Sequence, residues 1–372
     1  MHILIIASYA PSLLNFRGPL IRNLVEAGHR VSVTAPDLSS NHIGKIKALG
    51  ADPHDVTLKR NRLGIVGDIR YVLALRVLMN KLSPDLVLTY TIKPNIWGAF
   101  AASSRGIDSV AMVTGLGYAF TNVGLLSLKS KVIRLIAARL YRAATNRNRT
   151  VIFQNPDDRD DFIAEGCLRD VSKARLVNGS GVDIDYYSRS PLPNSPTFLM
   201  IARLLGNKGV REYHKAGIEV RKVYPEADIQ LLGPMDDGPD GISEVEVEEW
   251  IEAGTKYLGA KDDVRPALQQ ARVFVLPSYR EGTPRSVLEA MAMGRPVITS
   301  DAPGCRETVR DHVEGYLVPV CDPRALSKAM LDMLANPDQV EKMADSAHRR
   351  ARERFSVSVV NAQMFKALGI DD

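Results

Sequence analysis

Two glutamates stand eight residues apart in the stretch "YREGTPRSVLEAMAMG" (279–294), directly after the apolar run "VFVLPS". Two carboxylates at such a spacing can work as a general acid and base, or can accept hydrogen bonds from sugar hydroxyls. Thr283 fits a helix N-cap and Pro284 fits the first helical turn. We therefore expect Glu281 in a strand-to-helix loop and Glu289 nearly two turns inside the helix.

The start of this helix is a candidate anion site. The main-chain N–H groups around Arg285, Ser286 and Val287 are expected to be free there and to favour negative charge. A fixed carboxylate nearby would then accept hydrogen bonds from sugar hydroxyls. The alternative is that Glu289 is a surface acid and Glu281 a charge that complements the helix dipole.

Two cations in "IARLLGNKGVREYHKA" (201–216) follow another apolar run. Arg203 is expected at the end of a strand, and Lys208 at the opening of the next helix. An arginine fork and a lysine point charge at that place suit a diphosphate, and both would stabilise a departing nucleoside diphosphate. The alternative is a pair of solvated loop cations.

The elements that must position these residues form two series of short apolar runs separated by helix-length segments. Runs of this kind, rich in β-branched residues, predict buried parallel strands and doubly wound sheets. Such sheets bind ligands at the carboxyl ends of their strands. The first series comprises 2–8, 29–36, 85–91, 108–115 and 150–155, and the second comprises 197–203, 227–233, 256–260, 272–278, 295–300 and 315–320.

The chain of 372 residues is long for a single core, so two domains are expected. The Pro/Ser-rich stretch 186–196 reads as a linker between them. The predicted architecture is α/β, with two tandem Rossmann-like domains at 1–185 and 186–354. The helical segment 355–372 is expected to pack back on the first domain.

Composition narrows the function classes. Residues 1–190 carry 25 Lys and Arg against 15 Asp and Glu, which suits nucleic acid, a phosphate-rich ligand or an anionic membrane. The three cysteines are scattered, so neither a disulfide framework nor a zinc site is indicated. The opening "MHILIIASYAP" has no basic leader and no run reaches a membrane span, which favours a cytoplasmic protein without a cleaved signal.

Several motifs occur in an order that resembles the family 4 glycosyltransferases. They are "ARLLGNKG", "NGSGVD", "YLGAKDDV", "PSYREGTPRSVLEAMAMGRPVI" and "APGCRET". The family's enzymes have the GT-B fold and transfer a sugar from a nucleotide sugar with retention of configuration. The motifs "NFRGPLI", "TIKPN" and "TGLGYAF" resemble bacterial members that extend sugars on undecaprenyl diphosphate, including N-acetylgalactosaminyltransferases that act on bacillosamine-linked lipid.

The resemblance implies roles for individual residues. Arg203 and Lys208 would bind the donor diphosphate, Glu281 would contact the transferred sugar, and Glu289 would bind the ribose hydroxyls. Leu258 would lie at the base pocket. Further donor-binding main-chain groups would come from Gly18, Gly282, Thr283, Pro284, Arg285, Ser286 and Val287.

The acceptor side departs from the family pattern. Many members have a histidine near position 114, whereas this chain reads "VTGLGYAF". Lys93, Thr114 and Gly115 are the remaining acceptor-side candidates.

No metal or other cofactor is expected from the resemblance. The "DID" motif at 183–185 matches the family's linker region rather than a metal-binding DxD, and cationic side chains replace a metal. The family implies same-face attack, in which the leaving diphosphate takes the acceptor proton.

A basic segment raises the question of a membrane. Residues 125–149, "LLSLKSKVIRLIAARLYRAATNRNR", contain seven Lys and Arg and no acids, with apolar positions at helical spacing. Such a helix can lie in an anionic membrane interface, which suits a lipid-diphosphate acceptor. The alternative is an ordinary crossover helix covering the sheet.

These features together predict a metal-independent retaining glycosyltransferase. It would use a UDP-sugar, an N-acetylhexosamine or hexose donor, and an undecaprenyl-diphosphate-linked saccharide as acceptor, at the inner face of the cytoplasmic membrane. Two alternatives remain from the sequence: a twin-Rossmann nucleotide-sugar epimerase, and a basic nucleic-acid-binding protein. The paired Glu281 and Glu289 with Arg203 and Lys208 argue against the first, and the lack of interleaved exposed aromatics argues against the second.

Overall fold

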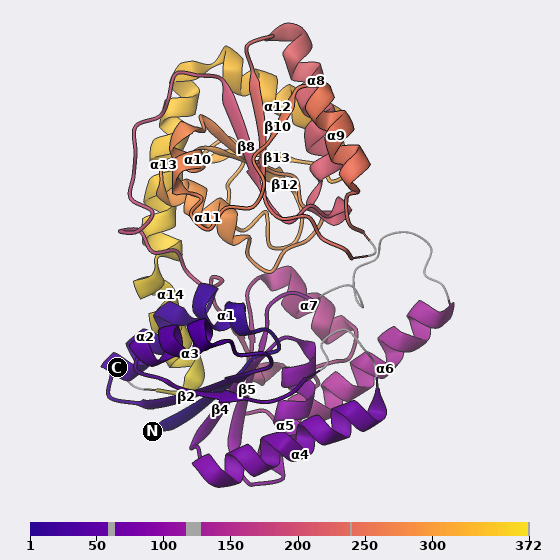
Figure 1. Ribbon diagram of the computed structural model, residues 1–372, viewed down its shortest axis with the longest axis vertical. Coiled ribbons are helices and arrows are strands. Elements are labelled where there is room, and N and C mark those ends of the chain that lie inside the picture. The colour runs from indigo at the N-terminus through magenta and orange to yellow at the C-terminus, as the bar shows by residue number, and fades with distance from the viewer. Residues whose placement is uncertain (59–63, 117–127, 239, 371–372) are drawn as a thin grey trace. The chain divides into compact units, whose positions relative to one another are not determined.

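The computed structural model describes residues 1–58, 64–116, 128–238 and 240–370 (Figure 1). The chain divides into two compact units. Unit 1 consists of Met1–Ser180 with Val360–Asp372, and unit 2 consists of Gly181–Val359. The C-terminal segment therefore returns to the first unit.

Unit 1 contains a parallel sheet of seven strands in the order β3-β2-β1-β4-β5-β6-β7. All five runs predicted in the first half form strands. The sequence missed β3, which is polar and contains Pro53, and the short β7; both are edge strands, which are not buried on two faces. The strands are β1 (His2–Ile6), β2 (Arg30–Ala35), β3 (Asp52–Asp55), β4 (Leu86–Tyr90), β5 (Asp108–Val113), β6 (Thr150–Phe153) and β7 (Ala174–Leu176).

Helices cover both faces of this sheet, because alternate residues of each strand point to opposite sides (Figure 1). On one face, Ile3 and Ile5 pack with α1 (Ala10–Asn15), α2 (Gly18–Glu26), α3 (Ser40–Ala48) and α14 (Val357–Leu368). On the other, Leu4 and Ile6 pack with α4 (Ile65–Leu82) and α5 (Ala99–Ser103). The second face continues with the π-helical turn η1 (Pro94–Gly98), α6 (Leu128–Thr145) and α7 (Pro156–Ala164).

The helix α14 is part of the core of unit 1. Val360, Met364, Phe365 and Leu368 are buried in the same cluster as β1 and β2. The side-chain oxygen of Gln363 also accepts the main-chain N–H of Asn178 at 2.9 Å. The C-terminal segment thus completes the layer that α1, α2 and α3 begin.

Unit 2 contains a second parallel sheet, of six strands in the order β10-β9-β8-β11-β12-β13. All six runs predicted in the second half form strands. They are β8 (Thr197–Ile201), β9 (Asp228–Leu232), β10 (Thr255–Tyr257), β11 (Val273–Leu276), β12 (Val297–Ser300) and β13 (Gly315–Val318). The helices are α8 (Val210–Val223), α9 (Glu244–Glu252), α10 (Arg265–Gln270), α11 (Arg285–Ala292), α12 (Pro323–Ala335) and α13 (Pro337–Phe355), with short 3₁₀ turns at η2 (Val171–Lys173) in unit 1 and η3 (Gly206–Lys208) in unit 2.

Each sheet reverses its strand order at one point, between β1 and β4 in unit 1 and between β8 and β11 in unit 2. Loops leaving such neighbouring strands turn to opposite faces and open a crevice at the carboxyl edge. The fold therefore predicts one ligand-binding edge in each unit. The loops after β8 and β11 carry Arg203, Lys208 and Glu281.

Candidate functional site

The loop after β8 and the loop after β11 are joined by an ion pair between Lys208 and Glu281. Lys208 Nζ lies 2.5 Å from Glu281 Oε1, and both side chains are mostly buried, with 19% and 17% of their surface exposed. Lys208 lies in η3, directly before Gly209, which has φ +73° and caps α8. The two residues singled out by separate motifs thus meet at the point where the sheet order reverses.

Glu281 is fixed by further contacts. The hydroxyl of Ser278 donates to Glu281 Oε1 at 2.7 Å, and the main-chain N–H of Glu281 donates to Pro303 O at 2.9 Å. Gly304 has φ +80°, and a Cβ there would lie 2.0 Å from Glu281 O. This packing explains the glycine in "APGCRET", and it shows that Ser278 and Gly304 are site residues that sequence reasoning missed.

Arg203 has a different partner. Its NH1 group donates to Asp236 Oδ2 at 2.7 Å, while 59% of the Arg203 side chain is exposed. The other guanidinium N–H groups have no protein acceptor in the described part of the chain. Arg203 is therefore positioned by Asp236 and still presents donors to solvent.

Helix α11 begins one residue later than predicted. Pro284, with φ −71° and ψ 108°, is the N-cap, so the assignment of Thr283 as N-cap is wrong; Thr283 donates instead to Gly282 O at 3.0 Å. The N–H of Val287 donates to Pro284 O at 3.2 Å, so it is not free for an anion as the sequence predicted. Proline at the N-cap offers no side-chain acceptor, so the turn closes through main-chain bonds.

Glu289 lies inside α11 as predicted, and it is buried rather than a surface acid. Its Oε1 lies 2.7 Å from Arg285 Nε, and the Tyr187 hydroxyl lies near enough to the carboxylate to affect its pKa. Burial raises the pKa of Glu289, an effect that Arg285 and Tyr187 only partly oppose. Burial likewise raises the pKa of Tyr187.

Leu258 follows β10 at the carboxyl edge of the sheet. Its N–H donates to Leu231 O at 2.8 Å, and the half-buried side chain packs against the core of unit 2. The neighbouring Tyr257 hydroxyl donates to Gly233 O at 2.8 Å. Leu258 is thus held beside the end of β9, next to the strand that leads to Arg203.

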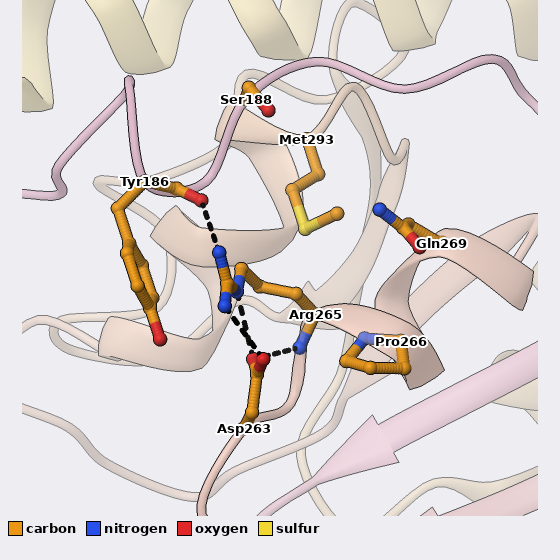
Figure 2. A pocket seen from close by; sticks show the side chains of 7 residues that line it. All are labelled: Tyr186, Ser188, Asp263, Arg265, Pro266, Gln269 and Met293. Atoms are coloured by element: carbon orange, nitrogen blue, oxygen red, sulfur yellow. Dashed lines mark hydrogen bonds and ion pairs between the residues drawn. The ribbon is translucent and has the colours of Figure 1, made fainter.

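A pocket of about 200 Å³ lies elsewhere in unit 2 (Figure 2). Arg265 within it is already satisfied by Asp263, whose Oδ2 lies 2.7 Å away, and by the Tyr186 ring at 3.8 Å. None of the predicted donor-binding residues lines this pocket, which is formed by Tyr186, Ser188, Asp263, Arg265, Pro266, Gln269 and Met293. Because the pocket contains none of those residues, we do not assign it to the donor.

The candidates in unit 1 follow β1, β4 and β5 at the carboxyl edge. Gly18 begins α2, and a Cβ there would approach no atom closer than 3.9 Å, so protein packing does not require glycine. Lys93 lies 2.9 Å from Asp68 of α4, with only 12% of its side chain exposed. Thr114 and Gly115 follow β5 and are half-buried.

In the part of the chain that the structure describes, no group of three or more His, Cys, Asp or Glu side chains could hold a metal ion. Asp183 of the "DID" motif accepts the N–H groups of Asp185 and Tyr186 at 3.1 and 3.0 Å. The motif therefore closes a turn.

The predicted basic helix forms α6, which begins at Leu128; residues 117–127 lie outside the described chain. Val132, Leu135 and Ile136 are exposed on it. Lys131 and Arg139 are also exposed, and neither has an acidic partner in the described chain. Four other basic side chains of the segment donate to groups within unit 1: Arg134, Arg142, Arg147 and Arg149.

A second apolar stripe lies on α4, where Val66, Ile69, Leu73 and Val77 are exposed. Both α4 and α6 contact α5 and η1, so the two helices cover the same face of the sheet (Figure 1). Within the described residues, no helix is both long and apolar enough to cross a membrane.

Comparisons with known proteins agree with this architecture. Residues 17–178 match the model described as "Glycosyl transferase 4-like domain", and residues 195–336 match "Glycosyl transferases group 1". The chain is 26% identical over 356 residues, 91% of each protein, to N,N'-diacetylbacillosaminyl-diphospho-undecaprenol alpha-1,3-N-acetylgalactosaminyltransferase of Campylobacter jejuni. It is also 26% identical to UDP-Gal:alpha-D-GlcNAc-diphosphoundecaprenol alpha-1,3-galactosyltransferase of Escherichia coli, covering 74% of this chain and 72% of that protein.

Solved structures share the fold. HepE of Anabaena, crystallised with UDP, superimposes with a TM-score of 0.80 at 19% identity, covering 99% of this chain and 100% of that one. Sucrose-phosphate synthase of Thermosynechococcus elongatus gives 0.81 at 19% identity, covering 98% of each chain. Taken with the family models and the arrangement of two parallel sheets, these matches show that the chain is a glycosyltransferase of the GT-B fold and belongs to family 4.

Proposed function

We propose that the enzyme transfers a sugar, an N-acetylhexosamine or a hexose, from a UDP-sugar to a saccharide carried on undecaprenyl diphosphate, with retention of configuration. The product would serve surface-glycan or protein-glycan assembly. The observation that carries the donor assignment is the Lys208–Glu281 pair at the strand-order reversal of unit 2, with buried Glu289 farther along the same motif. The names of the Campylobacter jejuni and Escherichia coli relatives support the acceptor class.

Each part of the donor is assigned to different residues along the carboxyl edge of the sheet in unit 2. Lys208 and Arg203 supply positive charge for the diphosphate, which is favoured where water is partly excluded. Glu289 would accept hydrogen bonds from the ribose hydroxyls, because a carboxylate has about four acceptor positions and Arg285 and Tyr187 leave some of them open. Glu281 would hold the transferred sugar.

The reaction needs no separate base in this proposal. The bond from the anomeric carbon to the diphosphate oxygen breaks while the acceptor oxygen approaches the same face. The acceptor proton passes to the leaving diphosphate, whose negative charge Lys208 and Arg203 stabilise. Glu281 then positions the sugar and is not required as a nucleophile, and the cationic side chains take the role that a metal has elsewhere.

We also propose peripheral contact with the inner face of the cytoplasmic membrane. The exposed apolar residues Val132, Leu135 and Ile136 lie on α6 with Lys131 and Arg139, an arrangement suited to an anionic interface. The stripe on α4 extends apolar surface on the same face of unit 1. A lipid-linked acceptor would be presented at such an interface.

The test is a panel of UDP-sugars incubated with synthetic polyprenyl-diphosphate saccharides, with and without EDTA, followed by mass analysis. The proposal predicts one donor consumed in proportion to extended lipid product, at the same rate in EDTA. If no UDP-sugar is consumed with any lipid acceptor, the proposal fails. A rate abolished by EDTA and restored by a divalent cation would overturn metal independence.

A further inference from the structure

Unit 1 contains a buried arginine without a counter-charge. Arg17 lies between α1 and α2, and only 3% of the residue's surface is exposed. No carboxylate of the described chain pairs with it, and its Nε is buried without a hydrogen-bond partner. Its recorded hydrogen bonds are long, at 3.4 Å to Phe16 O and 3.3 Å to the Ser180 hydroxyl.

A second buried arginine, Arg295, has hydrogen-bond acceptors that Arg17 lacks. Arg295 is fully buried in unit 2 and its Nε also lacks a partner, but its two terminal NH groups donate to Ala271 O at 3.0 Å, Ser190 O at 2.9 Å and Pro191 O at 3.0 Å. Those carbonyls replace the water that burial removes. Arg17 has no comparable set of acceptors.

Burying a guanidinium in this way is costly. Removing a charge from water costs several kcal/mol unless a partner compensates it, and burial lowers the pKa of Arg17. The Tyr90 ring lies 5.1 Å from the guanidinium and offers only its π face, since burial raises the pKa of Tyr90 to about 12 and its hydroxyl bonds to Ser12 at 2.9 Å. An anion bound at Arg17 would offset this cost.

The position of Arg17 is the one at which the fold expects a ligand. The residue follows β1, and Tyr90 ends β4, so the pair spans the strand-order reversal of the sheet in unit 1. Gly18 comes next and leaves its surroundings uncrowded. The nearby Tyr9 and Phe16 are exposed, so this edge reaches the surface.

We propose that Arg17 is the anion receptor of unit 1 and binds a phosphate or diphosphate group of a substrate. A planar guanidinium matches two phosphate oxygens at once, which suits a diphosphate better than a single carboxylate. The inference rests on the proposed function for the source of the group, the lipid diphosphate of the acceptor, because the donor diphosphate is already assigned to Lys208 and Arg203 of unit 2.

The experiment is calorimetric titration of the full chain with inorganic pyrophosphate while saturating UDP occupies the donor site. Variants Arg17→Met and Arg17→Lys are compared with Arg22→Met, which removes an exposed arginine of α2, the helix that begins directly after Arg17. We expect pyrophosphate affinity to fall at least tenfold in Arg17→Met, less in Arg17→Lys, and not at all in Arg22→Met. Equal pyrophosphate binding by Arg17→Met and the unaltered chain would overturn the proposal.

Two further measurements distinguish an acceptor site from a donor site and control for misfolding. Farnesyl diphosphate titrated with UDP present reports an acceptor-type site, whereas a loss of affinity for UDP itself in Arg17→Met would place the group on the donor and overturn the proposal. The melting temperature of ligand-free Arg17→Met should equal or exceed that of the unaltered chain, since a costly buried charge is gone. A large drop that Arg17→Lys restores would instead show a structural cation and overturn the proposal.

The proposed function can fail separately. If UDP does not bind the unaltered chain, the donor assignment is wrong, and pyrophosphate titrations without UDP still compare Arg17→Met with Arg22→Met.

Discussion

Lys208 and Glu281, which are 73 residues apart in the sequence, form a mostly buried ion pair between the loops that follow β8 and β11. In the absence of a donor, Glu281 neutralises the cation that we assign to the diphosphate. A diphosphate entering the site must therefore compete with Glu281 for Lys208. The pair links the binding of the nucleotide to the position of the carboxylate that would hold the sugar.

The first prediction concerns this competition. Glu281→Gln should bind UDP as tightly as the unaltered enzyme or more tightly, because Lys208 no longer has an anionic partner, yet turnover should fall at least a hundredfold. Lys208→Met should lose both UDP affinity and turnover. Calorimetry with UDP and a steady-state transfer assay measure the two quantities. Weaker UDP binding by Glu281→Gln would contradict the competition.

The second prediction concerns Gly304. A Cβ at this position would clash with Glu281 O, and φ is positive, so Gly304→Ala should displace the loop that holds Glu281. Turnover should fall at least tenfold, with a destabilisation of roughly 1–3 kcal/mol. Gly28→Ala is the matched control, because Gly28 has the same φ of +80° but no atom within 4 Å of an added Cβ. Normal turnover by Gly304→Ala would show that Glu281 need not be held there.

The third prediction uses the buried carboxylate of Glu289. Burial raises its pKa in the folded chain above the unfolded value, so folding takes up a proton between these two pKa values. The contribution of Glu289 to stability therefore falls as pH rises through this window and stays at its lower level above it. Glu289→Gln should remove this loss, so the variant at neutral pH should melt at the same temperature as the unaltered protein or higher.

The same variant should bind UDP about 10- to 100-fold more weakly, since hydrogen bonds from ribose to a charged acceptor contribute roughly 1.5–3 kcal/mol. Melting curves from pH 4 to pH 8 and UDP titrations provide the data. Glu248→Gln, an exposed acid of α9, serves as the control. Undiminished UDP affinity in Glu289→Gln would remove Glu289 from the donor site.

The fourth prediction concerns the face formed by α4 and α6. Replacing Leu135 and Ile136 by serine should lower binding to anionic vesicles at least fivefold without altering stability, because both side chains are exposed. Val245→Ser removes an exposed apolar side chain from unit 2 and should have no effect. Vesicle cosedimentation at low and high salt is the measurement. Unchanged binding by the double variant would contradict membrane contact through α6.

The strands that hold the site could be predicted from the sequence, and the edge strands could not. Central strands are buried on both faces and read as continuous apolar runs, whereas β3 reads "DPHD" because one side of it has no neighbouring strand. The resemblance of motifs placed Lys208 and Glu281 in one site, and their ion pair agrees with that placement. Sequence reasoning did not reveal that the two charges neutralise one another.

Ion-pair partners that are far apart in the sequence could not be predicted either. Asp236 binds Arg203 across 33 residues, and Glu165 binds Arg134 across 31, and neither partner stands at a spacing that a local pattern reveals. The basic segment 125–149 therefore looked more available to a membrane than it is. The assignment of Thr283 as the N-cap was wrong because Pro284, the next residue, is itself the N-cap.

The anomeric configuration of the transferred sugar in the product is the sharpest test of the proposed reaction. The unaltered enzyme is incubated with the UDP-sugar that it consumes and a polyprenyl-diphosphate saccharide in EDTA, and the new linkage is assigned by proton coupling constants in NMR. We expect an extended lipid-linked saccharide whose new bond keeps the donor's α configuration, and no such product with Lys208→Met. A β linkage, or release of free sugar without lipid extension, would contradict it.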